Sequence, residues 1–288
     1  MNGLRRALAV VAVAALAFPA VAQFSIQETY ASGIITNRLG ETMPMRVWRK
    51  YAPKDCPVPV VVLLHGSGTC GQDNASQLGD FSSFHTSVLI DDTLPPALYI
   101  IPQCTAANPW VRTIAFTADY RQPRYPAPAL RTVKEYLEAL VKEGTADPDR
   151  LYIGGFSLGG FGTWDAIQRW PGFFAAALPV CGGGSIQEVP VRNATQTALW
   201  IFHGSADGNV SVDCSRRMVA ALTQAGAAPK YTEYPNAGHG IWQRALGDTA
   251  VIRWLFRQRR GHRESEDTEP TSALGGFFRQ LKAYVTPK

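Results

Sequence analysis

The chain has 288 residues, of which 46% are hydrophobic and 18% are charged. This composition supplies enough apolar side chains for a sizeable core and excludes a globally disordered protein. The formal net charge is only +5 and the basic residues are scattered, which argues against a nucleic-acid-binding protein with a clustered basic face. The five cysteines exclude a small disulfide scaffold, and no His/Cys group has zinc-site spacing, so we expect neither a metal nor another cofactor.

Residues 1–22 have the three-part layout of a secretory signal peptide. The pair Arg5-Arg6 is followed by the apolar run Ala7–Phe18 and by Ala20-Val21-Ala22, a small-x-small cleavage site. Because the apolar run is shorter than the about 20 residues of a membrane span, removal after Ala22 is favoured over an uncleaved anchor. The sequence therefore predicts a secreted or periplasmic protein, in a compartment where disulfides persist.

The segments that follow alternate between strand and helix patterns. Ser25–Tyr30 and Met45–Ala52 are expected to form two antiparallel strands around the turn Asn37–Gly40. Apolar runs typical of buried parallel strands then alternate with amphipathic helical patterns. The expected strands are Val58–Leu64, Ala97–Ile101, Leu151–Gly154, Ala175–Val180, Leu199–Phe202 and Lys230–Tyr234, and the expected helices are Ala127–Glu143, Leu158–Trp170, Ser211–Ala225 and Ile241–Arg257. This alternation predicts an α/β fold with a mostly parallel, doubly wound sheet of about eight strands.

The last thirty residues differ from the rest of the chain. No linker or internal repeat interrupts residues 23–258, which are expected to form one domain. Residues 259–270 are charged and rich in turn formers, which predicts a solvated linker. In residues 274–285 the apolar side chains share one helical stripe. A short helix that docks on the domain or stays disordered is favoured over a membrane-surface contact, because the stripe is short.

Gly155-Phe156-Ser157-Leu158-Gly159 is a G-x-S-x-G motif between an expected strand and an expected helix. A sharp turn there lifts a serine hydroxyl above the sheet, and glycines two residues before and after it let the helix approach the strand. The turn also directs the N–H groups at the helix start toward developing negative charge. We therefore predict that Ser157 is a catalytic nucleophile rather than an incidental serine in a glycine-rich turn.

A serine hydroxyl needs a base to take its proton, and His239 is predicted to supply it. His239 lies in the glycine-flanked loop Asn236–Gly240, directly after the last expected strand, where catalytic groups lie in open α/β sheets. The other histidines have non-catalytic explanations: His65 and His203 end strands and shape loops, His85 lies in a loop, and His262 lies in the charged linker.

The acid that orients the histidine should lie between Ser157 and His239, at another strand end. Asp207 follows the strand Leu199–Phe202 and is the preferred candidate. The competitor Asp213 lies where the next helix begins, so a helix-capping role explains it more simply.

Acyl transfer also needs two N–H donors that stabilise the oxyanion. The backbone of Leu158, next after the predicted nucleophile, is expected to supply one. The other is expected from the loop after strand Val58–Leu64, with Ser67 preferred over Gly68.

Together these motifs resemble the α/β-hydrolase superfamily, and in particular its secreted esterase and predicted-peptidase group, which is related to polyhydroxybutyrate depolymerases and feruloyl esterases. The similar segments are Leu63–Gly68, Ile101–Cys104, Gly155–Asp165, Pro179–Gly184, Phe202–Val210 and Tyr231–Trp242. The resemblance implies the α/β-hydrolase fold, with Ser157, Asp207 and His239 as a catalytic triad. Relatives often carry charged residues at Ser67–Gly71, so the substrate contacts of this loop are left open.

The expected activity is cleavage of carboxylic esters through an acyl-enzyme intermediate, with ester substrates that include esters attached to a polymer. A serine peptidase and a catalytically silent binding protein of the same fold are the alternatives. The 18 residues Cys181–Ala198 leave no room for a separate lid domain, so an open site is expected. Its wall is expected from the insertions Thr69–Pro96 and Pro102–Pro126, which carry Trp110, Phe116, Tyr120 and Tyr125; core packing is the alternative for each aromatic residue.

In this fold, Cys70 and Cys104 follow neighbouring strands at the carboxyl-end rim, and so do Cys181 and Cys214. We predict a Cys70–Cys104 disulfide first and a Cys181–Cys214 disulfide as a second possibility, with Cys56 as a free thiol. Five reduced cysteines are the alternative.

Overall fold

The computed structural model describes residues 25–52, 56–112 and 120–261. Within these residues one sheet has eight strands in the order β1-β2-β4-β3-β5-β6-β7-β8. The strands are β1 (Ala31–Thr36), β2 (Thr42–Lys50), β3 (Val58–Leu64), β4 (Ala97–Pro102), β5 (Ala146–Phe156), β6 (Ala176–Val180), β7 (Ala198–Gly204) and β8 (Lys230–Tyr234). The pairs β1–β2 and β2–β4 are antiparallel, and every other pair is parallel. The expected mostly parallel sheet is confirmed.

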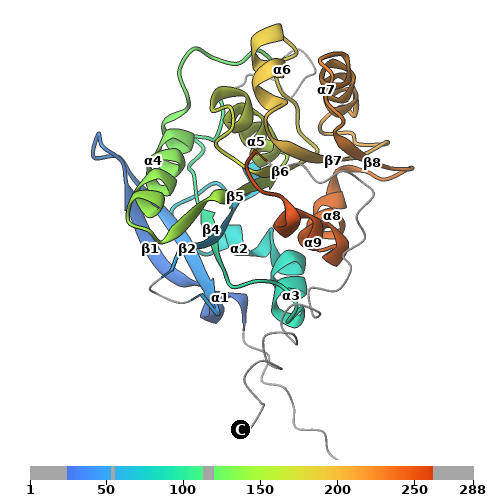
Figure 1. Cartoon of the computed structure of the whole chain (residues 1–288). Helices are drawn as coiled ribbons and strands as arrows, with labels where there is room; N and C mark the ends of the chain where they lie inside the picture. The colour runs from blue at the N-terminus through green and yellow to red at the C-terminus, as the bar shows by residue number, and fades with distance from the viewer. Residues whose placement is uncertain (1–24, 53–55, 113–119, 262–288) are drawn as a thin grey trace, which may run out of the picture.

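Helices cover both faces of this sheet. They are α1 (Ile26–Thr29), α2 (Ser76–Gly79), α3 (Ser82–Ile90), α4 (Pro128–Lys142), α5 (Leu158–Arg169), α6 (Glu188–Ala194), α7 (Asp213–Gln224), α8 (Trp242–Leu246) and α9 (Thr249–Arg257), with the 3-10 turns η1 (Ser67–Thr69) and η2 (His239–Ile241). Helices α4, α5 and α7 pack on one face, and α3, α8 and α9 pack on the other (Figure 1). The sheet is therefore doubly wound, as expected from the strand-helix alternation.

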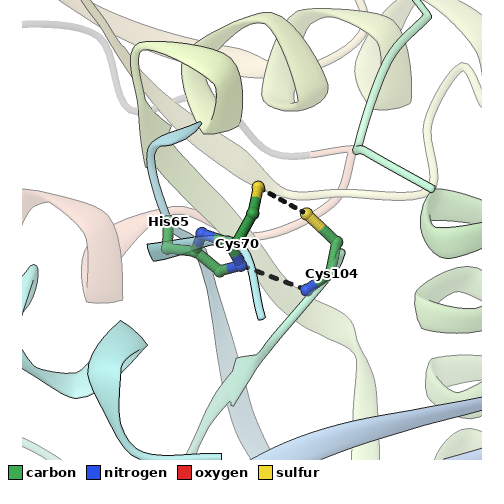
Figure 2. Close-up of side chains that lie close together, drawn as sticks. All are labelled: His65, Cys70 and Cys104. Carbon is green, nitrogen blue, oxygen red and sulfur yellow. Dashed lines mark hydrogen bonds between the residues drawn. The ribbon is translucent and has the colours of Figure 1, made fainter. Parts of the chain in front are cut away.

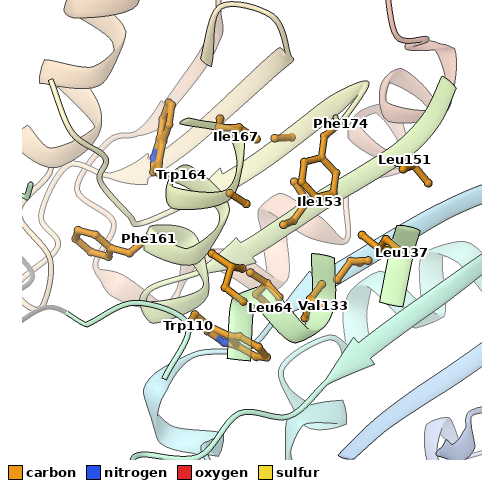
Figure 3. Packing of buried hydrophobic residues seen from close by; sticks show 14 of the residues in the cluster. Leu64, Trp110, Val133, Leu137, Leu151, Ile153, Phe161, Trp164, Ile167 and Phe174 are labelled. Carbon is orange, nitrogen blue, oxygen red and sulfur yellow. The ribbon is translucent and has the colours of Figure 1, made fainter. Parts of the chain in front are cut away.

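The hydrophobic core has two parts, one on each face of the sheet. Strand β3 is buried along its whole length, and alternate side chains enter opposite parts: Leu64 packs on the α4–α5 side and Leu63 on the α3–α9 side. Figure 3 shows Leu64 among Trp110, Phe161 and Val133 on the first side. A continuous apolar run is what a strand covered by helices on both faces requires.

The first expected strand, Ser25–Tyr30, is wrong. Ser25 instead caps the short helix α1, because its hydroxyl accepts the Glu28 N–H while the Glu28 carboxylate accepts the Ser25 N–H. The strand starts at Ala31 and pairs with β2 across the expected turn at Asn37–Gly40.

The expected helix Ile241–Arg257 is divided into η2, α8 and α9. The helical run is interrupted before α9, because Asp248 is the N-cap of that helix and its carboxylate accepts the Ala250 N–H. Helices α3 and α6 were not expected from the sequence, and His85 lies in α3 rather than in a loop. In α3 the buried side chains of Phe84 and Val88, four residues apart, are the periodic signal that could have indicated a helix.

Several expectations lie outside the described residues, namely the signal peptide 1–22, residues 262–288 of the C-terminal segment, and Phe116. The described start of that segment packs on the domain, since the Arg260 amide donates to the Asp149 carbonyl at 2.9 Å. Among the helices of residues 25–52, 56–112 and 120–261, none is long and apolar enough to span a bilayer.

Candidate active site

Ser157 lies on a sharp turn between β5 and α5. Its backbone has φ of 54° and ψ of −120°, a left-handed conformation that is unfavourable for a residue with a side chain. Two hydrogen bonds hold it there: its amide donates to the Val180 carbonyl at 2.9 Å, and its carbonyl accepts the Phe161 N–H at 3.0 Å. The turn thus fixes the backbone of the predicted nucleophile through both the neighbouring strand β6 and the following helix.

The two glycines of the motif are needed for close approach of α5 to the sheet. A Cβ atom on Gly155 would lie 2.6 Å from the carbonyl oxygens of both Leu64 and Gly159, and one on Gly159 would overlap the Leu64 carbonyl. Backbone atoms cannot withdraw from such a clash without moving β3. The steric explanation of the G-x-S-x-G pattern is therefore confirmed.

His239 lies at the start of η2, after β8, and is hydrogen-bonded to Asp207. Its Nδ1 atom lies 2.7 Å from Asp207 Oδ2. Because a carboxylate only accepts, Nδ1 carries the proton and Nε2 is left with a lone pair. This is the tautomer that a general base requires.

The Asp207 carboxylate is buried and accepts hydrogen bonds from three donors. Besides His239, the amides of Asn209 and Val210 donate to its Oδ1 atom at 2.9 and 3.0 Å. Burial raises the pKa of Asp207, but these amides and the His239 ring lower it by more, so the pKa lies below its usual value. The carboxylate therefore stays ionised at neutral pH.

His203 lies against the same carboxylate, a contact that the sequence reasoning missed. His203 Nε2 lies 3.3 Å from Asp207 Oδ2 and 3.0 Å from the Val210 carbonyl, and its Nδ1 lies 2.7 Å from Ser215 Oγ. Its expected role in shaping a loop is confirmed by the Val210 contact. The pair His203-Gly204 at a strand end four residues before Asp207 was the available signal.

Asp213 lies elsewhere. It is the first residue of α7, its side chain is 62% exposed, and it lies 3.4 Å from Arg216. An acid in the first turn suits the helix dipole, although the N-cap position itself belongs to Val212.

Ser157 and His239 line one cleft of about 320 Å³. The other lining residues are Gly66, Ser67, Gly68, Asp80, Phe156, Asn209, Val210 and Trp242. The rings of Phe156 and Trp242 stack at 4.2 Å with an interplanar angle of 8°. One wall of the cleft is therefore aromatic, although neither ring comes from the insertions expected to supply it.

The aromatic residues expected in the wall are placed elsewhere. Trp110 is fully buried in the core, where its Nε1 donates to the His65 carbonyl, and the buried Tyr120 donates to Asp165. Tyr125 is 71% exposed and borders a separate small hollow. Core packing was the correct alternative for Trp110 and Tyr120, because both residues of the insertion Pro102–Pro126 lie in the same part of the core as α5.

The loop Gly66–Gly68 also lines the cleft. Ser67 begins η1, so its amide and that of Gly68 have no acceptor within that turn, and Leu158 has the same position in α5. Asp80 Oδ2 accepts the Gly66 N–H at 3.3 Å and the Thr69 hydroxyl at 2.7 Å. Asp80, which the sequence reasoning also missed, thus holds this loop, and burial raises the pKa of its carboxyl.

No disulfide joins the five cysteines, all of which are described. The Cys70 and Cys104 sulfurs lie 3.8 Å apart, and Cys56 is exposed, as expected for a free thiol. The second pairing is not supported, because Cys181 packs in the α3–α9 part of the core and Cys214 in the α4–α5 part. The Cys181 thiol instead lies within 4.8 Å of the Asp207 and His239 side-chain atoms.

The sheet order, the helices on both faces and the serine turn after β5 define an α/β-hydrolase. Residues 50–252 match the family model described as phospholipase/carboxylesterase, and the chain belongs to that family. It is a carboxylesterase-family hydrolase.

Two relatives match more than half of this chain. A probable carboxylesterase of Oryza sativa subsp. japonica is 28% identical over 195 residues, which are 63% of this chain and 81% of the relative. An uncharacterized secreted protein of Arthroderma benhamiae is 25% identical over 71% of this chain, but the match spans only 23% of that protein.

Solved structures show the same fold. The crystal structure of a thermostable esterase has a TM-score of 0.71 and 31% identity, over 82% of this chain and 64% of that chain. A ferulic acid esterase has a TM-score of 0.60 over 79% of this chain and 98% of its own, with 15% identity, and so shares the fold. The chain therefore spans less than two thirds of the thermostable esterase chain.

Proposed function

We propose that this protein is an exported serine carboxylesterase with Ser157 as nucleophile, His239 as general base and Asp207 as the orienting acid. The observation that carries the proposal is the 2.7 Å hydrogen bond between His239 and Asp207, made at the cleft that Ser157 also lines. Export is supported by the sequence of residues 1–22 and by the name of the Arthroderma relative.

In the proposed reaction, Ser157 Oγ attacks the ester carbonyl carbon while His239 Nε2 takes the hydroxyl proton. Asp207 stabilises the imidazolium that forms and keeps its ring in place. The imidazolium then donates the proton to the leaving alcohol, and an acyl-enzyme remains on Ser157. Water, deprotonated by His239, attacks this ester in turn and releases the acid.

The negative charge on the substrate oxygen is proposed to be stabilised by two backbone amides. One belongs to Leu158 at the start of α5, where the helix dipole adds to the effect. The other belongs to Ser67, or to Gly68 as second choice, in the segment Gly66–Gly68 that we call the oxyanion loop.

The size and the openness of the cleft favour ester substrates with a small acyl group and a large alcohol group. Its volume of about 320 Å³ holds a short acyl chain beside the Phe156–Trp242 stack. Only the short helix α6 lies between β6 and β7, so no separate lid domain covers the site there. Esters that are attached to a polymer can therefore reach Ser157.

A serine peptidase on the same residues is the second candidate. An acylaminoacyl peptidase of Pyrococcus horikoshii has a TM-score of 0.57, but its identity is 14% and the match covers 43% of that chain, so it supports only the shared fold. A silent binding protein is disfavoured, because the predicted base, acid and nucleophile are all present.

The test is hydrolysis of p-nitrophenyl esters, from acetate to palmitate, beside the matching anilides. We expect esters to be cleaved faster than anilides and short acyl chains to be preferred. Ser157→Ala should lower kcat by about 10³-fold or more with the fold intact. Ser32→Ala, which removes an exposed hydroxyl on β1, is the matched control and should keep full activity. Faster anilide cleavage would favour the peptidase, and wild-type turnover by the Ser157→Ala variant would refute the nucleophile.

A further inference from the structure

Two cysteines, Cys70 and Cys104, lie next to the oxyanion loop, and a hydrogen bond joins the backbone segments that carry them. Cys70 follows η1 and is half-buried, and Cys104 follows β4 and is buried. Their sulfur atoms are 3.8 Å apart, and Figure 2 shows both thiols beside the His65 ring. The Gly71 amide donates to the Cys104 carbonyl at 2.9 Å, so the two backbones are already joined at this point.

We infer that Cys70 and Cys104 are a site of oxidative modification, at which a disulfide closes and clamps the oxyanion loop in its active conformation. The sulfurs must approach from 3.8 Å to about 2.05 Å, a change within reach of side-chain rotation. The clamp on catalysis rests on the proposed function, whereas formation of the disulfide does not.

The oxyanion loop is connected to both cysteines. On one side, the Cys70 amide donates to the Ser67 carbonyl at 3.3 Å. On the other side, the Cys104 amide donates to His65 Nε2 at 3.1 Å, and His65 Nδ1 donates to the Gly66 carbonyl at 2.7 Å. A covalent bond between the cysteines would therefore close a ring around the loop through contacts at both of its ends.

A metal ion is a poorer occupant of this cluster. The donor atoms of His65, Cys70 and Cys104 lie within 4.8 Å of one another. However, Nδ1 of the ring donates to the Gly66 carbonyl and Nε2 accepts the Cys104 amide, so no lone pair is directed at a shared ion. Burial lowers the pKa of His65 to about 4, so the ring remains neutral and keeps both hydrogen bonds.

The oxidant is a disulfide of a small thiol or of a thiol–disulfide oxidoreductase. The Cys70 thiolate attacks one sulfur of that disulfide and releases the first thiol. The Cys104 sulfur then attacks the mixed disulfide on Cys70 and releases the second. The two protein thiols lose two electrons and two protons, which the two released thiols carry away.

Cys70 is the attacking residue in this sequence. It is the more accessible of the two, and the hydrogen bond with the Cys104 thiol lowers its pKa, whereas burial raises the pKa of Cys104. The buried Cys104 sulfur then reacts only with the mixed disulfide on the neighbouring Cys70.

The first arm of the test is mass spectrometry of the full chain after equilibration with oxidised or reduced glutathione. Free thiols are alkylated under denaturing, non-reducing conditions before digestion. In the sample equilibrated with oxidised glutathione, we expect one cross-linked pair of peptides, joined through Cys70 and Cys104 and two hydrogens lighter than the separate peptides. Cys56, Cys181 and Cys214 should be alkylated. Alkylation of all five cysteines, a different pairing, or glutathione left on Cys70 would overturn the proposal, and so would retained zinc at an unbridged pair.

The second arm compares ester hydrolysis by the oxidised and reduced chain. Reduction should lower kcat about tenfold and leave KM unchanged. The effect should be smaller than the about 10²–10³-fold loss that follows complete removal of an oxyanion donor, because reduction only loosens the loop that carries the donor. The double variant Cys70→Ser/Cys104→Ser should have the kcat of the reduced enzyme, and glutathione should not change it. The control Cys56→Ser should respond to glutathione as the wild type does. A cross-link without a kinetic effect would refute the clamp. If no ester is cleaved at all, the proposed function fails, and the first arm still decides the disulfide.

Discussion

His203 Nε2 lies 3.3 Å from Asp207 Oδ2, the same carboxylate oxygen that lies 2.7 Å from His239 Nδ1. Both side chains of the first pair are fully buried. Burial lowers the pKa of His203, so the ring is neutral, donates from Nε2 to the Val210 carbonyl and accepts the Ser215 hydroxyl at Nδ1. Because the Val210 amide donates to Asp207, the neutral ring holds the acid in place through Val210, without a positive charge that would compete with His239 for it.

His203→Gln should therefore loosen Asp207. Because small misplacements of catalytic groups are costly, kcat should fall by about 10- to 100-fold with KM little changed. The acid limb of the pH–rate profile should also move, which a purely structural defect would not cause. Ser215→Ala, which removes the partner of His203 Nδ1, should give a smaller loss in the same direction. An unchanged kcat and pH profile would show that His203 only shapes its loop.

Asp207→Asn should lower kcat by about 10⁴-fold, because an amide can donate to His239 and stabilise the wrong tautomer. The matched control is Asp213→Asn, which changes an exposed acid six residues away and should keep activity near the wild-type level. Steady-state hydrolysis of p-nitrophenyl acetate measures both. The reverse ranking would mean that the acid is misassigned.

Gly159→Ala should destabilise the fold, since the new methyl group would overlap the Leu64 carbonyl. Overpacking against backbone costs about 1–3 kcal/mol or more of the free energy of unfolding. Gly79→Ala is the control, because a Cβ atom there meets nothing within 4 Å. Urea unfolding followed by circular dichroism compares the two variants, and equal midpoints would contradict the steric explanation of the motif.

Trp242→Ala should weaken the binding of aromatic substrates more than that of aliphatic ones. Its stacking with Phe156 places an aromatic face on the cleft, and an aromatic pair contributes about 0.5–1.5 kcal/mol beyond area burial. KM should therefore rise severalfold for phenyl acetate and change less for ethyl acetate, measured by acid release. An equal rise for both esters would show a general loss of cleft shape.

Stability at low pH should depend on Asp91. Its hydrogen bond with the Arg253 guanidinium, 2.8 Å long, lowers its pKa from 3.8 to about 2. Because the folded pKa is depressed, this stabilisation is fully present above about pH 4 and is lost as the pH falls toward 2. Asp91→Asn should thus lower the urea midpoint at pH 7.

The difference between Asp91→Asn and the wild type should narrow between pH 4 and pH 2. Asp92→Asn, at the exposed neighbouring position, is the control and should follow the wild type. A gap that stays constant down to pH 2 would show that the ion pair is not the cause.

Much of the fold could be predicted because its signals are local. The run Val58–Leu64 is a strand with those bounds, since a short, continuous apolar run rich in β-branched residues suits a strand buried on both faces. The turn at Ser157 was equally predictable, because steric demands restrict positions 155 and 159 to glycine. In contrast, Ser25–Tyr30 has an ambiguous pattern, and a single capping box decided for α1.

The residues of the candidate site could be predicted only where the order of strands along the chain determines which loops are neighbours. Loops after strands β7 and β8 meet at one edge of the sheet, which made Asp207 and His239 neighbours in expectation before any contact was known. Which aromatic rings reach the cleft depends on how the insertions fold back, and Trp110 turned into the core while Trp242 did not.

By itself the amino-acid sequence determined the strand-helix alternation, the serine turn and the candidate residues at the strand ends, because these depend on side-chain periodicity and on backbone sterics within a few residues. Only the tertiary structure decided the contacts between residues far apart in sequence. His203 lies 3.3 Å from the same oxygen of Asp207 that His239 contacts, and Asp80 accepts the Gly66 amide. Such contacts depend on register and side-chain direction across the whole sheet, and no local pattern encodes them.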